Sequence, residues 1–236
     1  MRVLVTRPQP AASRTAERLR AMGHEPVVLP LSKIVAVGPE RNAVPDAADA
    51  VAITSANAII HAPVELLRRV APLPCYCVGA QTGTVALRHG FEDVRVADGD
   101  GLALANRLAV SIARPASILY LCGRQRRPEL EAALVETGFH VTAVETYDTI
   151  KHELSPVDLA DLAAAPVGAV LVYSPNSAAA IRRLTQRPGL EATFTQARFL
   201  CLSARVALAL DAPRHRILVS PKPTETALLG LLGETN

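Results

Sequence analysis

The sequence predicts an α/β protein built from parallel sheets. Short apolar runs rich in Val, Ile and Leu alternate along the 236-residue chain with stretches whose apolar residues recur at helical spacing. Runs such as Ala50–Thr54 and Cys75–Val78 are almost continuously apolar, which is typical of parallel strands covered by helices on both faces. One phrase also occurs twice after such a run, as TSANAII at Thr54–Ile60 and as SPNSAAAI at Ser174–Ile181. We therefore expect an internal repeat of α/β units.

The elements of the first half follow one another as strand and helix. The periodicity predicts strand Val3–Thr6, helix Ala11–Met22, strands Pro26–Leu29 and Ala50–Thr54, helix Ala56–Val70, strand Cys75–Val78, helix Thr82–His89, strand Val94–Val96 and helix Leu102–Ala113. Pro8 and Pro175 lie near expected first-turn positions, and Gly23, Gly90 and Gly138 are expected to end helices.

The second half repeats the first in the same order. ILYLCGRQRRPELEAALVETGFHVTAVETY follows the pattern of VLVTRPQPAASRTAERLRAMGHEPVVLPLS, FLCLSARVALAL that of CYCVGAQTGTVAL, and PTETALLGLL that of GDGLALANRL. Strand–helix units resemble one another by chance, but the shared order and the matching junctions favour a duplication. Two similar lobes usually form a cleft, with ligands beyond the carboxyl ends of the strands.

Composition narrows the class of protein. The chain is 50% hydrophobic and 20% charged but only 3% aromatic, so we expect a globular protein with an aliphatic core. No apolar stretch reaches the roughly 18 residues of a membrane span, and Arg7 and Pro8 interrupt the start too early for a signal peptide. We therefore expect a cytoplasmic protein without membrane contact. The four cysteines lie in apolar runs without metal-ligand spacing, which predicts buried free thiols at Cys75, Cys77, Cys122 and Cys201.

Charge and motifs exclude several function classes. The net charge of +3 is small and the arginines are scattered, so nucleic-acid binding is not expected. One local cluster, Arg124-Gln-Arg126-Arg127, is either a solvated helix entrance or an anion-binding group. The chain has no GxGxxG, GxxxxGK[ST], GxSxG or HExxH motif, and its histidines lack ligand spacing, so no metal site is predicted. Asp98-Gly-Asp100-Gly is expected to be a turn rather than a calcium site.

Polar residues gather at the predicted strand-to-helix junctions. Helix starts present unpaired N–H groups and a partial positive charge that suit carboxylates or phosphates. Simple helix capping is the alternative for any single residue. The candidates are Thr54, Ser55 and Asn57, then Gly79 and Thr82, and in the second half Ser174, Asn176, Ser203 and Thr224.

With these junctions in view, the whole chain resembles the uroporphyrinogen-III synthase family. The matching stretches are VLVTRPQ, LPLSKI, AITSANAI, VGAQT, VETYDTI, VYSPNSAA and SPKPTETALLGLL. The resemblance implies two flavodoxin-like parallel-sheet lobes joined by a two-stranded extended linker. One lobe would comprise residues 1–34 and 151–236 and the other residues 35–150, with linker segments 31–37 and 144–150.

The resemblance also implies a reaction. Family members close hydroxymethylbilane, a linear tetrapyrrole with eight carboxylates, to uroporphyrinogen III in haem biosynthesis, with loss of water and inversion of ring D. The protein's task is to hold the two ends in position and exclude water while a reactive azafulvene forms and closes through a spiro centre. No cofactor is implied. We expect a monomer, with a transient contact to the preceding pathway enzyme as a further possibility.

Site residues carry over position by position. Tyr147 matches the family's cleft tyrosine, a candidate to help the hydroxyl leave, or else a tyrosine that packs in the linker. Ser55, Thr82 and Ser174 match hydroxyl positions that line the cleft. Arg7 would pair with a carboxylate or brace its loop. Many members carry Thr where this chain has Val206, so Ser203 or Arg205 would take over one substrate hydrogen bond.

Two alternatives from other classes remain. Synthase-like domains are also found fused to DNA-binding regulators, so an inactive two-lobe binding or regulatory module is possible. The chain shows no winged helix after Leu232, which favours a free-standing enzyme. A periplasmic-type solute-binding protein is disfavoured by the missing signal peptide.

Overall fold

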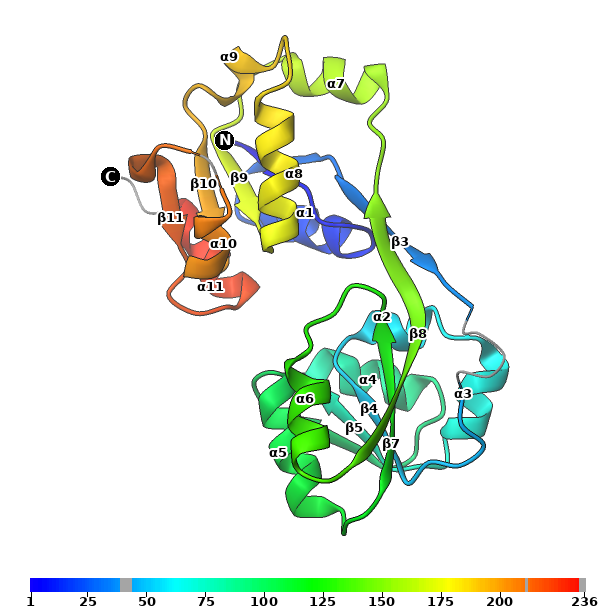
Figure 1. Cartoon of the computed structure of the whole chain (residues 1–236). Helices are drawn as coiled ribbons and strands as arrows, with labels where there is room; N and C mark the ends of the chain where they lie inside the picture. Colours follow the sequence, from blue (N-terminus) through cyan, green and yellow to red (C-terminus); the bar gives the residue numbers. More distant parts are fainter. Residues whose placement is uncertain (39–43, 211, 234–236) are drawn as a thin grey trace. The chain divides into compact units, whose positions relative to one another are not determined.

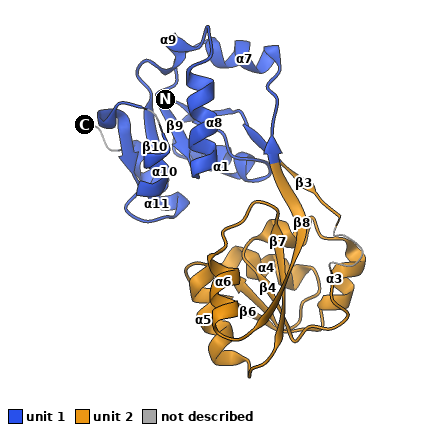
Figure 2. Ribbon diagram, viewed as in Figure 1, with its two compact units in different colours: residues 1–33, 150–236 blue, residues 34–149 orange. Residues whose placement is uncertain are grey.

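The computed structural model describes residues 1–38, 44–210 and 212–233 and has two compact units. Unit 1 comprises Met1–Lys33 and Ile150–Asn236, and unit 2 comprises Ile34–Thr149 (Figure 2). Each unit contains a sheet dominated by parallel pairs with helices packed against it, so the predicted α/β class is confirmed. No helix of the described ranges is long and apolar enough to cross a membrane.

Unit 1 contains a five-stranded sheet in the order β11-β10-β9-β1-β2. Its strands are β1 (Arg2–Val5), β2 (Glu25–Val28), β9 (Ala169–Val172), β10 (Arg198–Cys201) and β11 (Ile217–Val219). All four neighbouring pairs are parallel. The chain runs from β1 outward to β2 but from β9 outward to β10 and β11, so the strand order reverses between β1 and β9. Such a reversal leaves a crevice beyond the carboxyl ends of the two strands.

The helices of unit 1 cover both faces of this sheet (Figure 1). They are α1 (Ala11–Ala21), α7 (Pro156–Ala163), α8 (Pro175–Thr185), α9 (Glu191–Phe194), α10 (Ala204–Leu208) and α11 (Glu225–Gly230), with 3₁₀ turns at Arg214–Arg216 and Leu231–Gly233. Successive side chains of a strand point to opposite faces of the sheet. Val3 and Val5 therefore pack with α1 and α11, whereas Leu4 packs with α7 to α10.

Unit 2 is built on a six-stranded sheet in the order β3-β8-β7-β4-β5-β6. Its strands are β3 (Ser32–Ala36), β4 (Ala50–Ile53), β5 (Cys75–Val78), β6 (Val94–Ala97), β7 (Ser117–Gly123) and β8 (His140–Lys151). The chain passes between the units within β3 and within β8, which are neighbours in the sheet. The strand order reverses between β7 and β4, because β7 leads to β8 while β4 leads to β5 and β6.

Five helices of the described residues 34–38 and 44–149 cover the sheet of unit 2. They are α2 (Ala56–Ile60), α3 (Val64–Val70), α4 (Ala80–Arg88), α5 (Gly101–Ser111) and α6 (Glu129–Glu136). Apolar residues of α5 and α6 pack with one face of the strands, and those of α2, α3 and α4 pack with the other. All four cysteines are buried free thiols, as predicted.

Some predicted element bounds need correction. The helix predicted over Ala56–Val70 is two helices, because Pro63 lacks an N–H group and disfavours helical geometry at the residue before it. The helix predicted from Thr82 begins at Ala80. Pro175 is the first residue of α8, as expected, but α1 begins at Ala11, beyond Pro8.

The glycine prediction is confirmed, whereas the stretch predicted as a turn, Asp98–Gly101, leads directly into α5. Gly23, Gly90 and Gly138 follow helices with positive φ angles of 77°, 94° and 91°. Asp100 caps α5, accepting hydrogen bonds from the backbone N–H groups of Leu102 and Ala103.

Candidate functional site

A pocket of about 390 Å³ lies in unit 2 where the strand order reverses. It is bounded by the residues that follow β4, the end of β7 and its following loop, the start of α5, and one residue of β8. The lining residues are Thr54, Ser55, Val78, Asp100, Gly101, Leu102, Tyr120, Gly123, Gln125, Arg126, Arg127, Glu129, Leu130 and Tyr147. The pocket therefore occupies the position at which doubly wound sheets bind ligands.

Tyr147 enters this pocket because β8 contains a bulge. In the pairing of β7 with β8, Cys122 is opposite Glu145 but the next residue, Gly123, is opposite Tyr147. The extra residue, Thr146, is buried and donates a hydrogen bond to the carbonyl oxygen of Ala58 at 2.8 Å. Bulges of this kind commonly redirect a side chain next to a functional site.

Burial raises the pKa of Tyr147 above its ordinary value. The nearby hydroxyl of Ser55 acts in the opposite direction and offsets this effect only in part. Ser55 is also the N-cap of α2, where its hydroxyl accepts from the N–H of Asn57 at 3.3 Å. At neutral pH Tyr147 is therefore a neutral phenol held at the pocket wall, able to donate a hydrogen bond.

A second phenol lines the same pocket. The hydroxyl oxygen of Tyr120 on β7 is 2.9 Å from Oγ1 of Thr54. Tyr120 is buried, and this burial raises its pKa to about 12 despite the hydrogen bond with Thr54. Two hydroxyl pairs, Thr54 with Tyr120 and Ser55 with Tyr147, thus lie at the carboxyl edge of the sheet.

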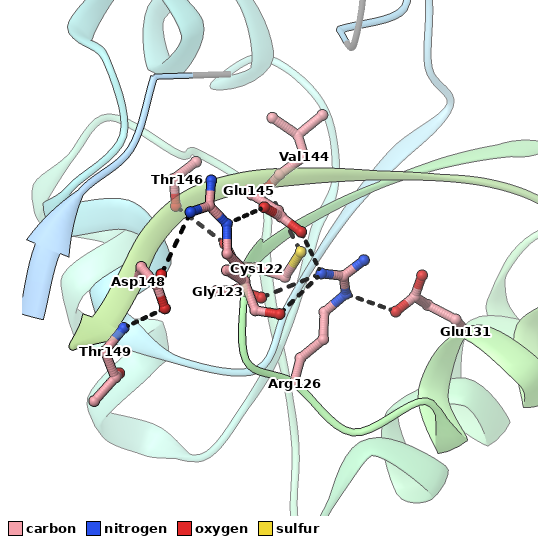
Figure 3. Close-up of polar contacts among 10 residues, drawn as sticks. Cys122, Gly123, Arg126, Glu131, Val144, Glu145, Thr146, Asp148 and Thr149 are labelled. Atoms are coloured by element: carbon pink, nitrogen blue, oxygen red, sulfur yellow. Dashed lines mark hydrogen bonds and ion pairs between the residues drawn. The ribbon is translucent and has the colours of Figure 1, made fainter. Parts of the chain in front are cut away.

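The arginine cluster of the β7–α6 loop is partly neutralised within the unit (Figure 3). Glu145 accepts from Arg126 at 2.8 Å and from Arg124 at 3.1 Å, and Arg126 also binds Glu131 at 2.8 Å. Hydrogen bonds from Arg126 are the main reason why the pKa of Glu145 is below its ordinary value. These ion pairs fix the loop that forms one wall of the pocket.

Arg127 differs from its two neighbours. It lines the pocket, its side chain is exposed, and no carboxylate among residues 1–38, 44–210 and 212–233 forms an ion pair with it. Two carboxylates, Asp100 and Glu129, also line the pocket, but Asp100 is engaged as the cap of α5. Arg127 is therefore the cation best placed to receive an anionic group of a ligand.

The remaining unit 2 candidates do not line the pocket. Asn57 is in the first turn of α2, and Gly79 is the N-cap of α4 with a φ of 77° and no side-chain cap. Thr82 is only 6% exposed and packs within α4. These residues shape the helix starts beside the pocket.

The unit 1 candidates lie at helix starts. The hydroxyls of Ser174 and Ser177 form a capping box at α8, with Asn176 in the same turn. Ser203 is the N-cap of α10 without a side-chain cap bond, and Arg205 is exposed on that helix. Val206 is buried in the core of unit 1.

Arg7 lies within a polar cluster of unit 1. Its guanidinium binds Glu225 at 3.0 Å, so Arg7 pairs with a carboxylate of the protein itself.

Sequence reasoning missed Tyr120, Gly123 and the start of α5 as parts of the pocket. Tyr120 is inside an apolar strand and gives no sign in the sequence that its hydroxyl meets Thr54. Gly123 ends β7, and its position directly after an apolar run was the available signal.

The described residues contain no group of three metal-ligating side chains.

The chain is therefore an α/β protein with two parallel-sheet units, one of which has a hydroxyl-lined pocket where its strand order reverses. Within that class, a family model described as uroporphyrinogen-III synthase HemD matches residues 13–230, and the chain belongs to this family.

Solved structures share the fold of this chain. The uroporphyrinogen-III synthetase of Helicobacter pylori has a TM-score of 0.68 and 18% identity, covering 98% of this chain and 97% of its own. A mutant uroporphyrinogen III synthase of Thermus thermophilus has a TM-score of 0.55 and 17% identity, covering 99% and 96%. At these identities the likeness establishes the fold. No curated protein sequence matches the chain significantly.

Proposed function

We propose that this protein is a uroporphyrinogen-III synthase that closes hydroxymethylbilane to uroporphyrinogen III, with loss of water and inversion of ring D. The family match over residues 13–230 carries the proposal. The pocket of unit 2 supports it, because its hydroxyls and its arginine suit a substrate whose arms are carboxylates.

Substrate binding in this proposal depends on charge and on size. A pocket of about 390 Å³ has room for part of a linear tetrapyrrole rather than for the whole molecule. Arg127 would bind one carboxylate arm, while the hydroxyls of Thr54 and Ser55 accept or donate further hydrogen bonds.

Bond making in this proposal involves Tyr147. The neutral phenol would donate a hydrogen bond to the departing hydroxyl of the substrate, which stabilises the leaving group without forming a charged catalytic group. Val78, Leu102 and Leu130 give the pocket an apolar wall that limits water near the azafulvene. Ring D can then attack through its substituted carbon, and the spiro centre reopens and closes in the inverted sense.

The other sequence candidates keep supporting roles in the proposal. Asn57, Gly79 and Thr82 shape helix starts in unit 2, and Ser174, Asn176, Ser203 and Arg205 would contact carboxylate arms at helix starts in unit 1. The monomeric state, the cytoplasmic location and a transient contact with the preceding enzyme stay predictions.

We also infer that the two units arose by duplication. The order β2-β1-β9-β10-β11 corresponds to β8-β7-β4-β5-β6, strand for strand, as the sequence repeats require. Both are flavodoxin-like orders in which the reversal falls between the second and third strands.

An isomer assay tests the proposal. Purified protein is incubated with freshly generated hydroxymethylbilane, and the uroporphyrinogen isomers are separated. We expect isomer III in excess over the spontaneous isomer I. An inactive binding module would bind the tetrapyrrole yet yield only isomer I at the spontaneous rate.

A further inference from the structure

A polar cluster in unit 1 lies where the strand order of its sheet reverses, beyond β1 and β9. In unit 2 the corresponding position is the pocket that contains Tyr147. In unit 1, Arg7 follows β1 and Tyr173 follows β9, and both lie on the sheet face that packs with α1 and α11. The two reversals are thus equivalent in topology but differ in what occupies them.

A single carboxylate, that of Glu225, occupies the unit 1 position. Its Oε1 accepts from Arg7 at 3.0 Å, from the hydroxyl of Tyr173 at 3.0 Å and from the hydroxyl of Thr15. Its Oε2 accepts from Arg18 at 2.9 Å. Two guanidinium groups and two hydroxyls from three separate chain segments therefore converge on one carboxylate.

The converging donors form a preorganised carboxylate site. The guanidinium of Arg7 lies 4.3 Å from the ring centroid of Tyr173, which fixes its plane. Burial alone would raise the pKa of Glu225, but Thr15, Arg7, Tyr173 and Arg18 together hold it below its ordinary value. The site therefore favours the ionised form of whatever carboxyl group enters it.

The occupant is chemically equivalent to an arm of the substrate. The side chain of Glu225 is a carboxyethyl group, as is a propionate arm of a tetrapyrrole. The cluster is also within reach of solvent, since the side chains of Glu225, Arg7 and Arg18 are 25%, 27% and 42% exposed. A ligand can thus exchange with Glu225 without opening the core.

We propose that Arg7, Thr15, Arg18 and Tyr173 form a second binding site for one carboxylate arm of the tetrapyrrole, and that Glu225 occupies this site until the ligand displaces it. The inference rests on the proposed function for the identity of the ligand. Glu225 is then an internal competitor that weakens binding in unit 1 and keeps two arginines ordered in the free protein.

Removing the charge of Glu225 tests whether this side chain competes with the ligand. Glu225→Gln should tighten binding of uroporphyrinogen III, kept free of oxygen and measured by calorimetry, by about ten-fold, since hydrogen bonds to a charged group are worth about that factor. Glu17→Gln is the matched control, because it removes an exposed carboxylate of α1 next to Arg18 and should change the affinity by less than about two-fold.

If Glu225 only stabilises unit 1, Glu225→Gln should lower the unfolding temperature without tightening product binding. If wild type forms isomer III but Glu225→Gln binds product no more tightly and only unfolds at lower temperature, the displacement proposal is wrong. If Glu225→Gln does not fold, product affinity is measured for Arg18→Gln instead, with Arg14→Gln as the control. A loss of about ten-fold in product affinity for Arg18→Gln alone supports the site, and equal affinities overturn it.

Failure of the proposed function would be seen separately, as isomer I alone from wild type. The carboxylate site of unit 1 is then tested with propionate as the probe, on the variant Glu225→Ala, which lacks the competing carboxylate. Propionate should raise the unfolding temperature of this variant but not of wild type, at matched ionic strength. No difference between the two proteins would overturn the carboxylate site itself.

Discussion

A Cβ atom at Gly123 would lie 2.5 Å from Cζ and 2.9 Å from the hydroxyl oxygen of Tyr147. The two residues are register partners in the pairing of β7 with β8, so the backbone holds them together. The ring of Tyr147 thus occupies the space in which any other residue would place its first side-chain carbon. The position of the proposed catalytic phenol depends on this glycine.

Gly123→Ala should therefore move Tyr147 while leaving most of unit 2 folded. The rate of isomer III formation should fall about 100-fold, because a displacement of about 1 Å is enough to misplace a reacting group. Gly38→Ala is the control, since a methyl group there meets no atom of the described residues within 4 Å. Equal rates for the two variants would contradict the positioning role.

Tyr147→Phe should slow the reaction more than it weakens binding. Loss of the phenol removes the hydrogen bond to the leaving hydroxyl, so kcat should fall by about 100-fold while the product Kd changes by less than about two-fold. Tyr76→Phe is the control and should keep the wild-type kcat. It removes another buried tyrosine hydroxyl of unit 2, which accepts from Arg95 at 2.6 Å outside the pocket. An unchanged kcat in Tyr147→Phe would leave the phenol only a packing role.

Arg127→Gln should show the reverse pattern. Loss of the Arg127 guanidinium, which forms no ion pair with a carboxylate of the described residues, should raise KM by about ten-fold with little change in kcat, and the difference should shrink at high salt. Arg88→Gln alters an exposed arginine at the end of α4, away from the pocket, and serves as the control. The same KM in both variants would remove Arg127 from substrate binding.

Ser174 combines a structural and a binding role in this account. Ser174→Ala removes half of the capping box of α8 and should lower the free energy of unfolding by about 1 kcal/mol. Ser155→Ala removes the equivalent hydroxyl of the capping box at α7 and should cost about as much in denaturant unfolding. Only Ser174→Ala should also weaken product binding. If both variants bind product like wild type, Ser174 is a cap and nothing more.

Glu145 should link the stability of unit 2 to pH. Its folded pKa is below the ordinary value of 4.5, chiefly because of Arg126, so its contribution is present above that value and disappears as pH falls through the folded pKa. Glu145→Gln should therefore lower Tm near neutral pH and flatten the loss of Tm as pH falls below 4.5. Glu136→Gln on α6 is the control and should keep the wild-type slope. Parallel curves for Glu145→Gln and wild type would contradict the linkage.

Much of the α/β pattern was predictable because strands such as β4 and β5 are continuous apolar runs and the helices between strands have apolar residues at helical spacing. The break at Pro63 was also visible in the sequence, since proline excludes the preceding residue from the helix, but the surrounding periodicity masked it. Thr54 and Ser55 were predictable site residues because the end of β4 places them at the carboxyl edge of the sheet.

The rest of the pocket depends on contacts between distant segments. Tyr120 meets Thr54 only because β7 and β4 are neighbours, and Gly123 meets Tyr147 only because β8 has a bulge at Thr146. Neither the strand order nor the bulge has a local signal in the sequence. The same holds for Glu225, which the fold brings to Arg7.

The isomer ratio of the product, followed as the protein concentration is raised, decides whether this protein forms uroporphyrinogen III. Hydroxymethylbilane is supplied at a fixed concentration, and uroporphyrinogens I and III are separated after a fixed short time. We expect the amount of isomer III to rise in proportion to the protein concentration and the amount of isomer I to fall. A constant amount of isomer I with no isomer III at any protein concentration would contradict it.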